Sequence, residues 1–174
     1  MLVSDLREKE VLVKIKVSLS LLVLFLFSLL PTHSWAWSGK VVGVADGDTI
    51  TVLRDKTQVR IRLYGIDTPE KGQAFGKKAK QFTSGMVFGK VVEVEVMATD
   101  RYGRTVALVV INKQILNEEL LKAGYAWVYY QYCHELICHA WADYQFAAKL
   151  DKRGLWAEPD PIPPWEFRRK TRRK

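Results

Sequence analysis

The feature that most restricts the fold is an alternation of apolar and polar residues between positions 40 and 64. It divides into three short segments, residues 40–44, 48–53 and 59–64, that are rich in β-branched residues. Successive side chains of a strand point to opposite faces, so the pattern predicts strands with one buried face. The dipeptide Asp46-Gly47 and the polar run 54–57 separate the segments and are typical of tight connections. We therefore expect three antiparallel strands here.

The remainder of the chain adds helices and two more strands. Apolar residues at helical spacing predict helices over residues 74–86, 116–121 and 138–152, which end near Gly89, Gly124 and Gly154. Residues 91–96 and 105–111 alternate again and predict strands. Five short strands with three α-helices indicate an α+β fold built on a five-stranded OB-type barrel, a common scaffold for oligonucleotides.

Both ends of the chain differ from this central part. Lys14 and Lys16 precede an apolar run over residues 17–30, and small residues occupy −3 and −1 of a cut after Ala36. This arrangement predicts a signal peptide over residues 1–36, and hence export to the periplasm or the medium. The run is shorter than the roughly 20 residues of a membrane-spanning helix; tethering through an uncleaved segment is the alternative. We expect one domain over residues 37–157, followed by a proline-rich linker and basic tail over 158–174 without regular structure.

Charge is distributed unevenly. The chain carries a net charge of +8, but residues 37–167 contain 17 basic and 16 acidic residues, whereas residues 168–174 contain six basic ones. The body is therefore nearly neutral, and nucleic-acid binding by it depends on individually placed residues. The tail either contacts phosphates or is simply solvated.

Acidic residues lie close to the ends of the predicted strands: Asp46, Asp48, Asp67 and Glu70. If the barrel closes, they share one cleft, where their mutual repulsion requires a cation. Carboxylate oxygens are hard ligands and select Ca²⁺ or Mg²⁺. The alternative is that residues 46–48 form a plain turn and residues 67–70 a loop that enters a helix.

Arginines supply charge of the opposite sign. Arg60 and Arg62 share one face of a strand, and Arg101 and Arg104 flank a turn. A guanidinium group grips a phosphate through two parallel hydrogen bonds and keeps its charge, which suits a phosphorane transition state. Surface arginines at strand ends are the alternative interpretation.

Three motifs appear in order: residues 45–49 (ADGDT), 62–70 (RLYGIDTPE) and 99–104 (TDRYGR). Together with residues 117–124 (NEELLKAG) and 154–156 (GLW), they resemble the motifs of the staphylococcal nuclease family, also called thermonucleases or micrococcal nucleases. The resemblance covers residues 38–157.

The resemblance implies a role for each matching residue. Asp48, Asp67 and the backbone carbonyl of Thr68 would hold Ca²⁺, with Asp46 supporting them. Glu70 would hold and deprotonate the attacking water, and Arg62 and Arg104 would bind the scissile phosphate. The substrate would also meet the Arg101-Tyr102 turn. The family reaction breaks the P–O5′ bond and leaves 3′-phosphates.

The family also places tyrosines after the second helix, where they contact the nucleotide. Here Tyr129, Tyr130 and Tyr132 crowd this position, and we assign the contact to Tyr130 and Tyr132. Stacking on a base tolerates any sequence, whereas packing against the protein is the alternative role for these side chains.

Cys133 and Cys138 are the two cysteines of a chain with a predicted export signal. An oxidising compartment favours a disulfide between them. Residues five apart on a regular helix cannot be bridged, so Cys133 must then lie in the loop before the third helix. The nearby His134 and His139 leave zinc binding or a stretched c-type haem attachment as alternatives.

The sequence thus predicts a secreted, Ca²⁺-dependent, monomeric endonuclease that cuts DNA and RNA, preferably single-stranded, without sequence preference. A non-catalytic nucleic-acid-binding module on the same barrel is the alternative.

Overall fold

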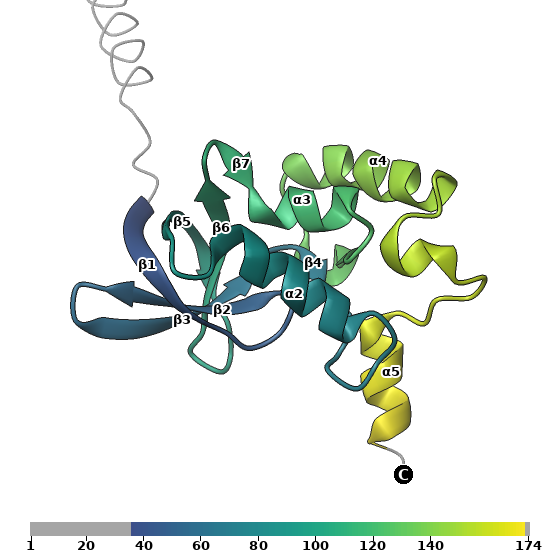
Figure 1. The fold of residues 1–174 in the computed structure, drawn as a ribbon, viewed down its shortest axis with the longest axis horizontal. Coiled ribbons are helices and arrows are strands. Elements are labelled where there is room, and N and C mark those ends of the chain that lie inside the picture. The colour runs from purple at the N-terminus through teal and green to yellow at the C-terminus, as the bar shows by residue number, and fades with distance from the viewer. Residues whose placement is uncertain (1–35, 173–174) are drawn as a thin grey trace, which may run out of the picture. The chain divides into compact units, whose positions relative to one another are not determined.

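The structure is a computed structural model that describes residues 36–172 (Figure 1). The predicted signal segment, apart from Ala36, lies outside the described residues. Five longer strands form the framework: β1 (Ala36–Val44), β2 (Thr49–Arg54), β3 (Thr57–Leu63), β5 (Val91–Thr99) and β6 (Thr105–Ile111). Their positions agree with the five expected strands.

These strands close into a barrel. They pair in the order β3-β2-β1-β5-β6 with antiparallel neighbours, and a parallel pairing of β3 with β6 joins the two edges. Register shifts between Val41 and Gly43 and between Val96 and Ala98 are β-bulges, which help strands to bend. The α+β class and the OB-type barrel are therefore confirmed.

Three strands of two residues each were not expected. β4 (Ile66–Asp67) pairs with β8 (Trp127–Val128), and β7 (Gln114–Ile115) pairs with the end of β6. The β4–β8 pair is important for the site because it fixes the residues that follow β3.

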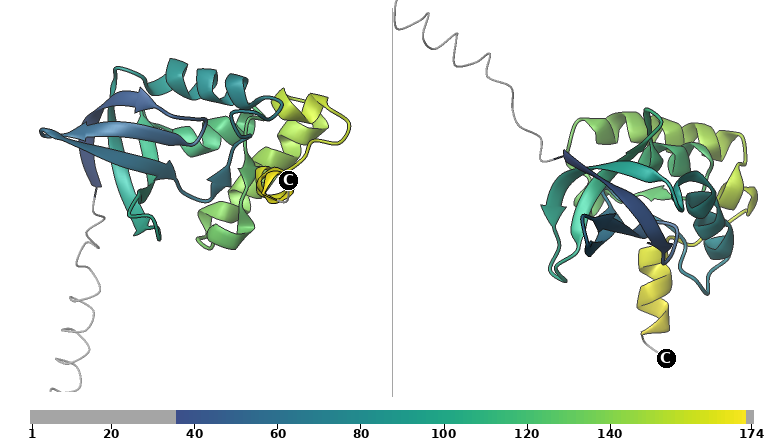
Figure 2. Two further views of the ribbon diagram at one scale, coloured as in Figure 1. Left: turned by 90° about the horizontal axis from the view of Figure 1, so that it is seen from below. Right: turned by 60° about the vertical axis from the view of Figure 1, so that its left-hand side comes forward.

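Three helices match the predicted ones: α2 (Gly76–Val87), α3 (Leu116–Lys122) and α4 (Ile137–Leu150). Two 3₁₀ turns, Tyr130–Tyr132 and Gly154–Ala157, flank α4. In Figure 2 the helices gather at one end of the molecule, away from the tip of the β2–β3 hairpin.

The expectation that the segment after the prolines lacks regular structure is wrong. Residues Pro164–Thr171 form a further helix, α5, with Pro164 in its first turn. Proline is compatible with that position, since its fixed φ suits the helix and no hydrogen bond is required of its nitrogen.

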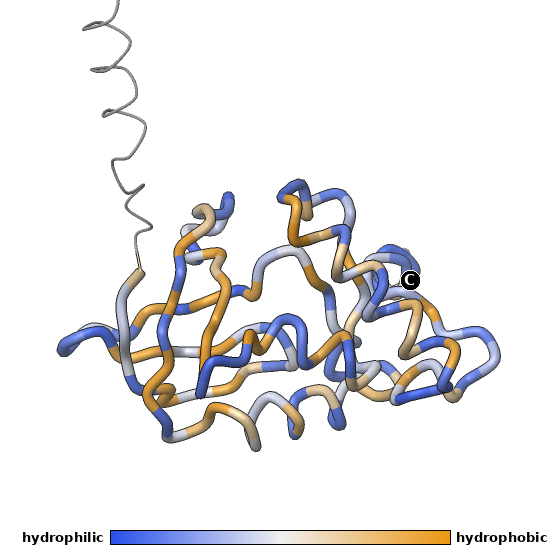
Figure 3. The backbone as a smooth tube through the Cα atoms, turned by 90° about the horizontal axis from the view of Figure 1, so that it is seen from above, coloured by the Kyte–Doolittle hydropathy of each residue, from blue (hydrophilic) through white to orange (hydrophobic). Residues whose placement is uncertain are grey.

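The core follows from the period-two pattern. Inward-facing residues such as Val41, Val52 and Ile61 are completely buried, and Trp141 of α4 is buried against the same cluster. In the hydropathy view, orange segments run through the barrel strands, whereas the tip of the β2–β3 hairpin and the C-terminal end are blue (Figure 3). No helix within residues 36–172 has the length and apolarity needed to cross a membrane.

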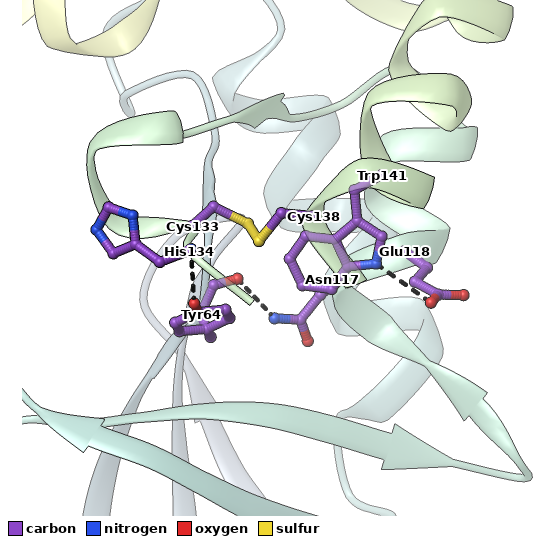
Figure 4. Close-up of a disulfide and its surroundings, with 7 residues drawn as sticks. All are labelled: Tyr64, Asn117, Glu118, Cys133, His134, Cys138 and Trp141. Atoms are coloured by element: carbon purple, nitrogen blue, oxygen red, sulfur yellow. Dashed lines mark hydrogen bonds between the residues drawn. A yellow bond between two sulfur atoms is a disulfide. The ribbon is translucent and has the colours of Figure 1, made fainter. Parts of the chain in front are cut away.

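A disulfide joins Cys133 to Cys138 (Figure 4). Cys133 precedes α4, as the bond requires, and both cysteines of the chain are consumed, which leaves no thiol for zinc or haem. Gly65 has a φ of +66°, and a Cβ there would lie 2.6 Å from Cys133 Sγ. The backbone N–H of His134 donates to the Tyr64 hydroxyl over 3.0 Å and ties this corner to the end of β3.

Candidate active site

The β2–β3 hairpin brings the first acidic motif to the end of the third strand. Thr49 is the register partner of Arg62, and Leu63 N–H donates to the Asp48 carbonyl over 2.8 Å. Antiparallel pairing alone therefore places Asp48 beside Arg62. The sequence suggested that barrel closure was needed to bring the first acidic motif to the end of the third strand. The hairpin does this instead, and barrel closure is needed to bring Arg104 to the same place.

Asp67 and Thr68 reach the same place through the β4–β8 pair, in which Asp67 is opposite Trp127. Thr68 donates to Asp48 Oδ2 twice, from its N–H over 2.7 Å and from its hydroxyl over 2.9 Å. Gly47 permits this approach, since a Cβ there would lie 2.7 Å from the Thr68 hydroxyl. Both aspartates are buried.

Arg62 lies between the two aspartates. Its Nη1 forms an ion pair with Asp48, and its Nη2 donates to Asp67 Oδ1 over 2.8 Å. Burial lowers the pKa of Arg62, and the negative charges of Asp67 and Asp46 offset part of that effect. One guanidinium thus links two carboxylates that would otherwise repel each other.

Arg104 enters the cleft from the turn before β6, which the parallel β3–β6 pairing places beside Arg62. Asp100 holds it, accepting from Arg104 Nε over 2.6 Å and from the Arg104 and Tyr102 backbone N–H groups. Although burial alone would raise the pKa of Asp100, these hydrogen bonds and the Arg104 charge lower it below its ordinary value. The exposed Tyr102 ring packs under the guanidinium groups of Arg101 and Arg104, at 4.8 and 5.6 Å.

Glu70 and Asp46 lie at the edge of the constellation. Asp46 Oδ1 accepts from Asp48 N–H over 3.2 Å, which supports the loop that presents Asp48. Glu70 has a side chain that is 36% exposed, and it accepts from Arg168 Nη1 over 2.6 Å. Burial alone would lower the pKa of Arg168, but its bonds to Asp67 and Glu70 raise it above the ordinary value.

All these groups line one cleft with a volume of about 660 Å³. Of the predicted site residues it contains Asp46, Asp48, Arg62, Asp67, Thr68, Glu70, Arg101, Tyr102, Arg104 and Tyr132. The cysteines lie outside its lining, as does Tyr130, which is 59% exposed. Tyr129 lines the cleft in its place, since the chain turns into a 3₁₀ helix directly after it.

Sequence reasoning missed several residues of this site. Arg168 lines the cleft from α5, which was expected to lack regular structure, and Trp165 of the same helix stacks on Tyr129. Asp100 was visible four residues before Arg104, but its bonds to the turn were not inferred. The available signal for this helix was Pro164 in the first turn, followed by Glu166 in that turn and basic residues in the last turn.

The donor chemistry of the cleft fits a hard divalent cation. Asp48 and Asp67 are buried carboxylates that share one neutralising guanidinium, and Thr68, the residue after Asp67, donates to Asp48. In the described part of the chain, however, no three acidic, histidine or cysteine side chains converge as a ligand group. Arg62 and Arg168 instead form ion pairs with the carboxylates of the two aspartates.

Comparison with known proteins gives concordant results. A sequence model described as "Staphylococcal nuclease homologue" matches residues 60–158, which include Arg62, Asp67, Glu70 and Arg104. "Micrococcal nuclease" of Shigella flexneri is 36% identical over 149 residues, covering 80% of this chain and 85% of that protein. An "Uncharacterized endonuclease" of Haemophilus influenzae is 42% identical over 134 residues, covering 76% and 74%. "Protein ParB" of Escherichia coli is 38% identical over 156 residues, covering 83% and 88%.

Proposed function

The chain belongs to the staphylococcal nuclease family and is a hydrolytic nuclease, and from this premise we propose that it is an exported, Ca²⁺-dependent endonuclease of DNA and RNA. The observation that carries the proposal is the convergence of Asp48, Asp67 and Glu70 with Arg62 and Arg104 in one cleft.

Each group has a chemical task in phosphodiester hydrolysis. Arg62 and Arg104 bind the scissile phosphate and stabilise the added negative charge of its transition state. Glu70, partly exposed at the edge of the cleft, holds the attacking water and accepts its proton. Attack in this arrangement expels the O5′ oxygen and leaves a 3′-phosphate, as the family resemblance implies.

Asp48, Asp67 and the Thr68 carbonyl are the groups that would hold Ca²⁺. When bound, the ion supplies Lewis-acid polarisation of a phosphoryl oxygen. The protein's own contribution is to keep two carboxylates close together in a buried position, which Arg62 makes possible.

A non-catalytic binding module is the alternative, and the charges of the cleft argue against it. Binding a polyanion favours basic and aromatic residues, whereas this cleft also presents Asp46, Asp48, Asp67 and Glu70. Carboxylates in that position are unfavourable for binding alone.

The proposed preference for single-stranded nucleic acid follows from the aromatic side chains that line the cleft. Arg101 and Tyr102 lie at its exposed edge, and Tyr132 is a 54% exposed aromatic in its lining. Such rings stack on any base, which supports cleavage of single-stranded nucleic acid without sequence preference. Of the two assigned tyrosines, Tyr132 has the support of the cleft geometry.

Export is supported by the disulfide, because such bonds persist in oxidising compartments. Together with the predicted signal segment, it supports export to the periplasm or the medium, and cleavage after Ala36 decides between a free protein and a membrane-tethered one. Cell fractionation should find the protein in the periplasm or the medium, and N-terminal sequencing should show that the mature chain begins after Ala36. A full-length chain in the membrane fraction would favour the tether.

The catalytic proposal is tested with Arg104→Lys. Lysine keeps the charge but cannot make the forked contact of a guanidinium, so we expect kcat on single-stranded DNA to fall by about 10²-fold. Lys56→Arg, at the far hairpin tip, is the control. Wild-type kcat in Arg104→Lys would remove this residue from the mechanism, and absence of nucleic-acid cleavage by the wild type would favour the binding module.

A further inference from the structure

The C-terminal helix is docked against the cleft through aromatic rings. Trp165 stacks on Tyr129 with ring centroids 5.0 Å apart and an interplanar angle of 6°, and it meets Trp127 edge-on at 6.5 Å. The Gln73 side chain donates to the Ile162 carbonyl just before the helix. In Figures 1 and 2, α5 accordingly stands beside the loop that leads into α2.

One turn beyond Trp165, α5 delivers a guanidinium to the acidic groups. Arg168 Nη2 donates to Asp67 Oδ2 over 2.8 Å, and Nη1 donates to Glu70 Oε1 over 2.6 Å and to Asp67 Oδ1 over 3.2 Å. Arg168 therefore bridges the expected metal ligand and the expected base.

Asp67 is left with little free coordinating capacity. Its side chain is 1% exposed, Oδ1 accepts from both Arg62 and Arg168, and Oδ2 accepts from Arg168. A cation that binds Asp67 therefore meets a guanidinium already in place. Arg62 is fixed on β3 within the barrel, whereas Arg168 lies on a terminal helix and keeps a 34% exposed side chain.

We propose that Arg168 is a positioning residue that competes with the metal ion for Asp67. Delivered by docked α5, it neutralises Asp67 and Glu70 until the cation takes Asp67, and it thereby weakens metal binding by the free enzyme. This inference rests on the proposed function, because it concerns the metal site of that reaction.

The test measures Ca²⁺ affinity by isothermal titration calorimetry, without nucleic acid, on the intact protein and its variants. Arg168→Ala should bind Ca²⁺ about tenfold more tightly than the wild type, within the usual range of coupling between two ligands. Trp165→Ala should also tighten binding, because α5 loses its stack on Tyr129. Arg169→Ala is the matched control: it removes the same charge from an exposed position that makes no ion pair within residues 36–172, and should leave the affinity within about twofold.

Thermal unfolding supplies a readout that a merely structural role would not produce. In chelator, Arg168→Ala should melt below the wild type, since Asp67 and Glu70 lose their partner. In saturating Ca²⁺ the difference in melting temperature should vanish, because linkage requires the tighter binding to compensate for it.

A difference in melting temperature that persists in Ca²⁺, or equal Ca²⁺ affinities of wild type and Arg168→Ala, would overturn the competition. Unchanged affinity in Trp165→Ala would overturn delivery by the docked helix, and absence of Ca²⁺ binding in every protein would instead refute the proposed metal dependence.

Discussion

At the scale of single residues, replacing Glu70 is the most direct test of the proposed general base. Its carboxylate reaches the cleft with a 36% exposed side chain, and a neutral amide of the same shape cannot accept a proton from water. Glu70→Gln should lower kcat by about 10²-fold, the usual effect of a positioned acid–base group. Steady-state kinetics on single-stranded DNA measures this.

Binding of nucleic acid by the Glu70→Gln variant serves as its control. The affinity should remain close to that of the wild type, since Arg62 and Arg104 are untouched. Near-normal kcat would show that another group takes the proton.

The site residues were predictable to the extent that they sit in contiguous motifs. Asp48, Asp67, Glu70, Arg62 and Arg104 come from three short stretches that also resemble a known family. Arg168 could not be found this way, because its contact with Asp67 spans 101 positions of sequence. Neither periodicity nor composition encodes a pairing at that distance.

At the scale of secondary-structure elements, the disulfide holds the corner between the 3₁₀ turn Tyr130–Tyr132 and α4. It closes a loop of six residues, so loop-closure entropy predicts a stabilisation of about 2 kcal/mol. The double variant Cys133→Ser with Cys138→Ser should lose that much in the free energy of unfolding, measured by urea denaturation.

Thiol chemistry provides the corresponding check on the bond. Native protein purified from an oxidising compartment should not react with an alkylating reagent until it is reduced. Alkylation of both cysteines without reduction would show that the bond is absent.

Elements with a sustained period were predictable, and those without one were not. The long strands alternate over several residues, α2 and α4 carry three or more turns, and α3 carries about two. β4, β7 and β8 have two residues each, too few to show a period. α5 was hidden by the prolines that precede it, although Pro164 starts the helix and Trp165 anchors it through a stack on Tyr129.

At the scale of the whole molecule, charge is separated between a nearly neutral body and the basic C-terminal end. Arg169 and Lys170 are exposed on α5 beside the cleft that Arg168 enters. If both contact phosphates, replacing them by glutamine should flatten the slope of log K against log salt by about 1.5 units. Fluorescence anisotropy with a long labelled single strand measures this slope.

Lys56 and Lys113, exposed in the β2–β3 and β6–β7 turns, are suitable controls for that experiment. Their replacement by glutamine changes the net charge equally but should preserve the slope. An unchanged slope in the Arg169 and Lys170 variant would show that the active-site arginines carry the electrostatics alone.

The central claim is a Ca²⁺-dependent phosphodiesterase, and one assay tests it most directly. Release of acid-soluble nucleotides from DNA and RNA is measured with Ca²⁺, with Mg²⁺ and with excess chelator, followed by end-group analysis of the products. We expect cleavage of both polymers in Ca²⁺ with 3′-phosphate ends, weaker cleavage in Mg²⁺ because its rigid octahedral sphere holds phosphate and water together poorly, and none in chelator. Full activity in chelator, or products that carry 5′-phosphates, would contradict the account.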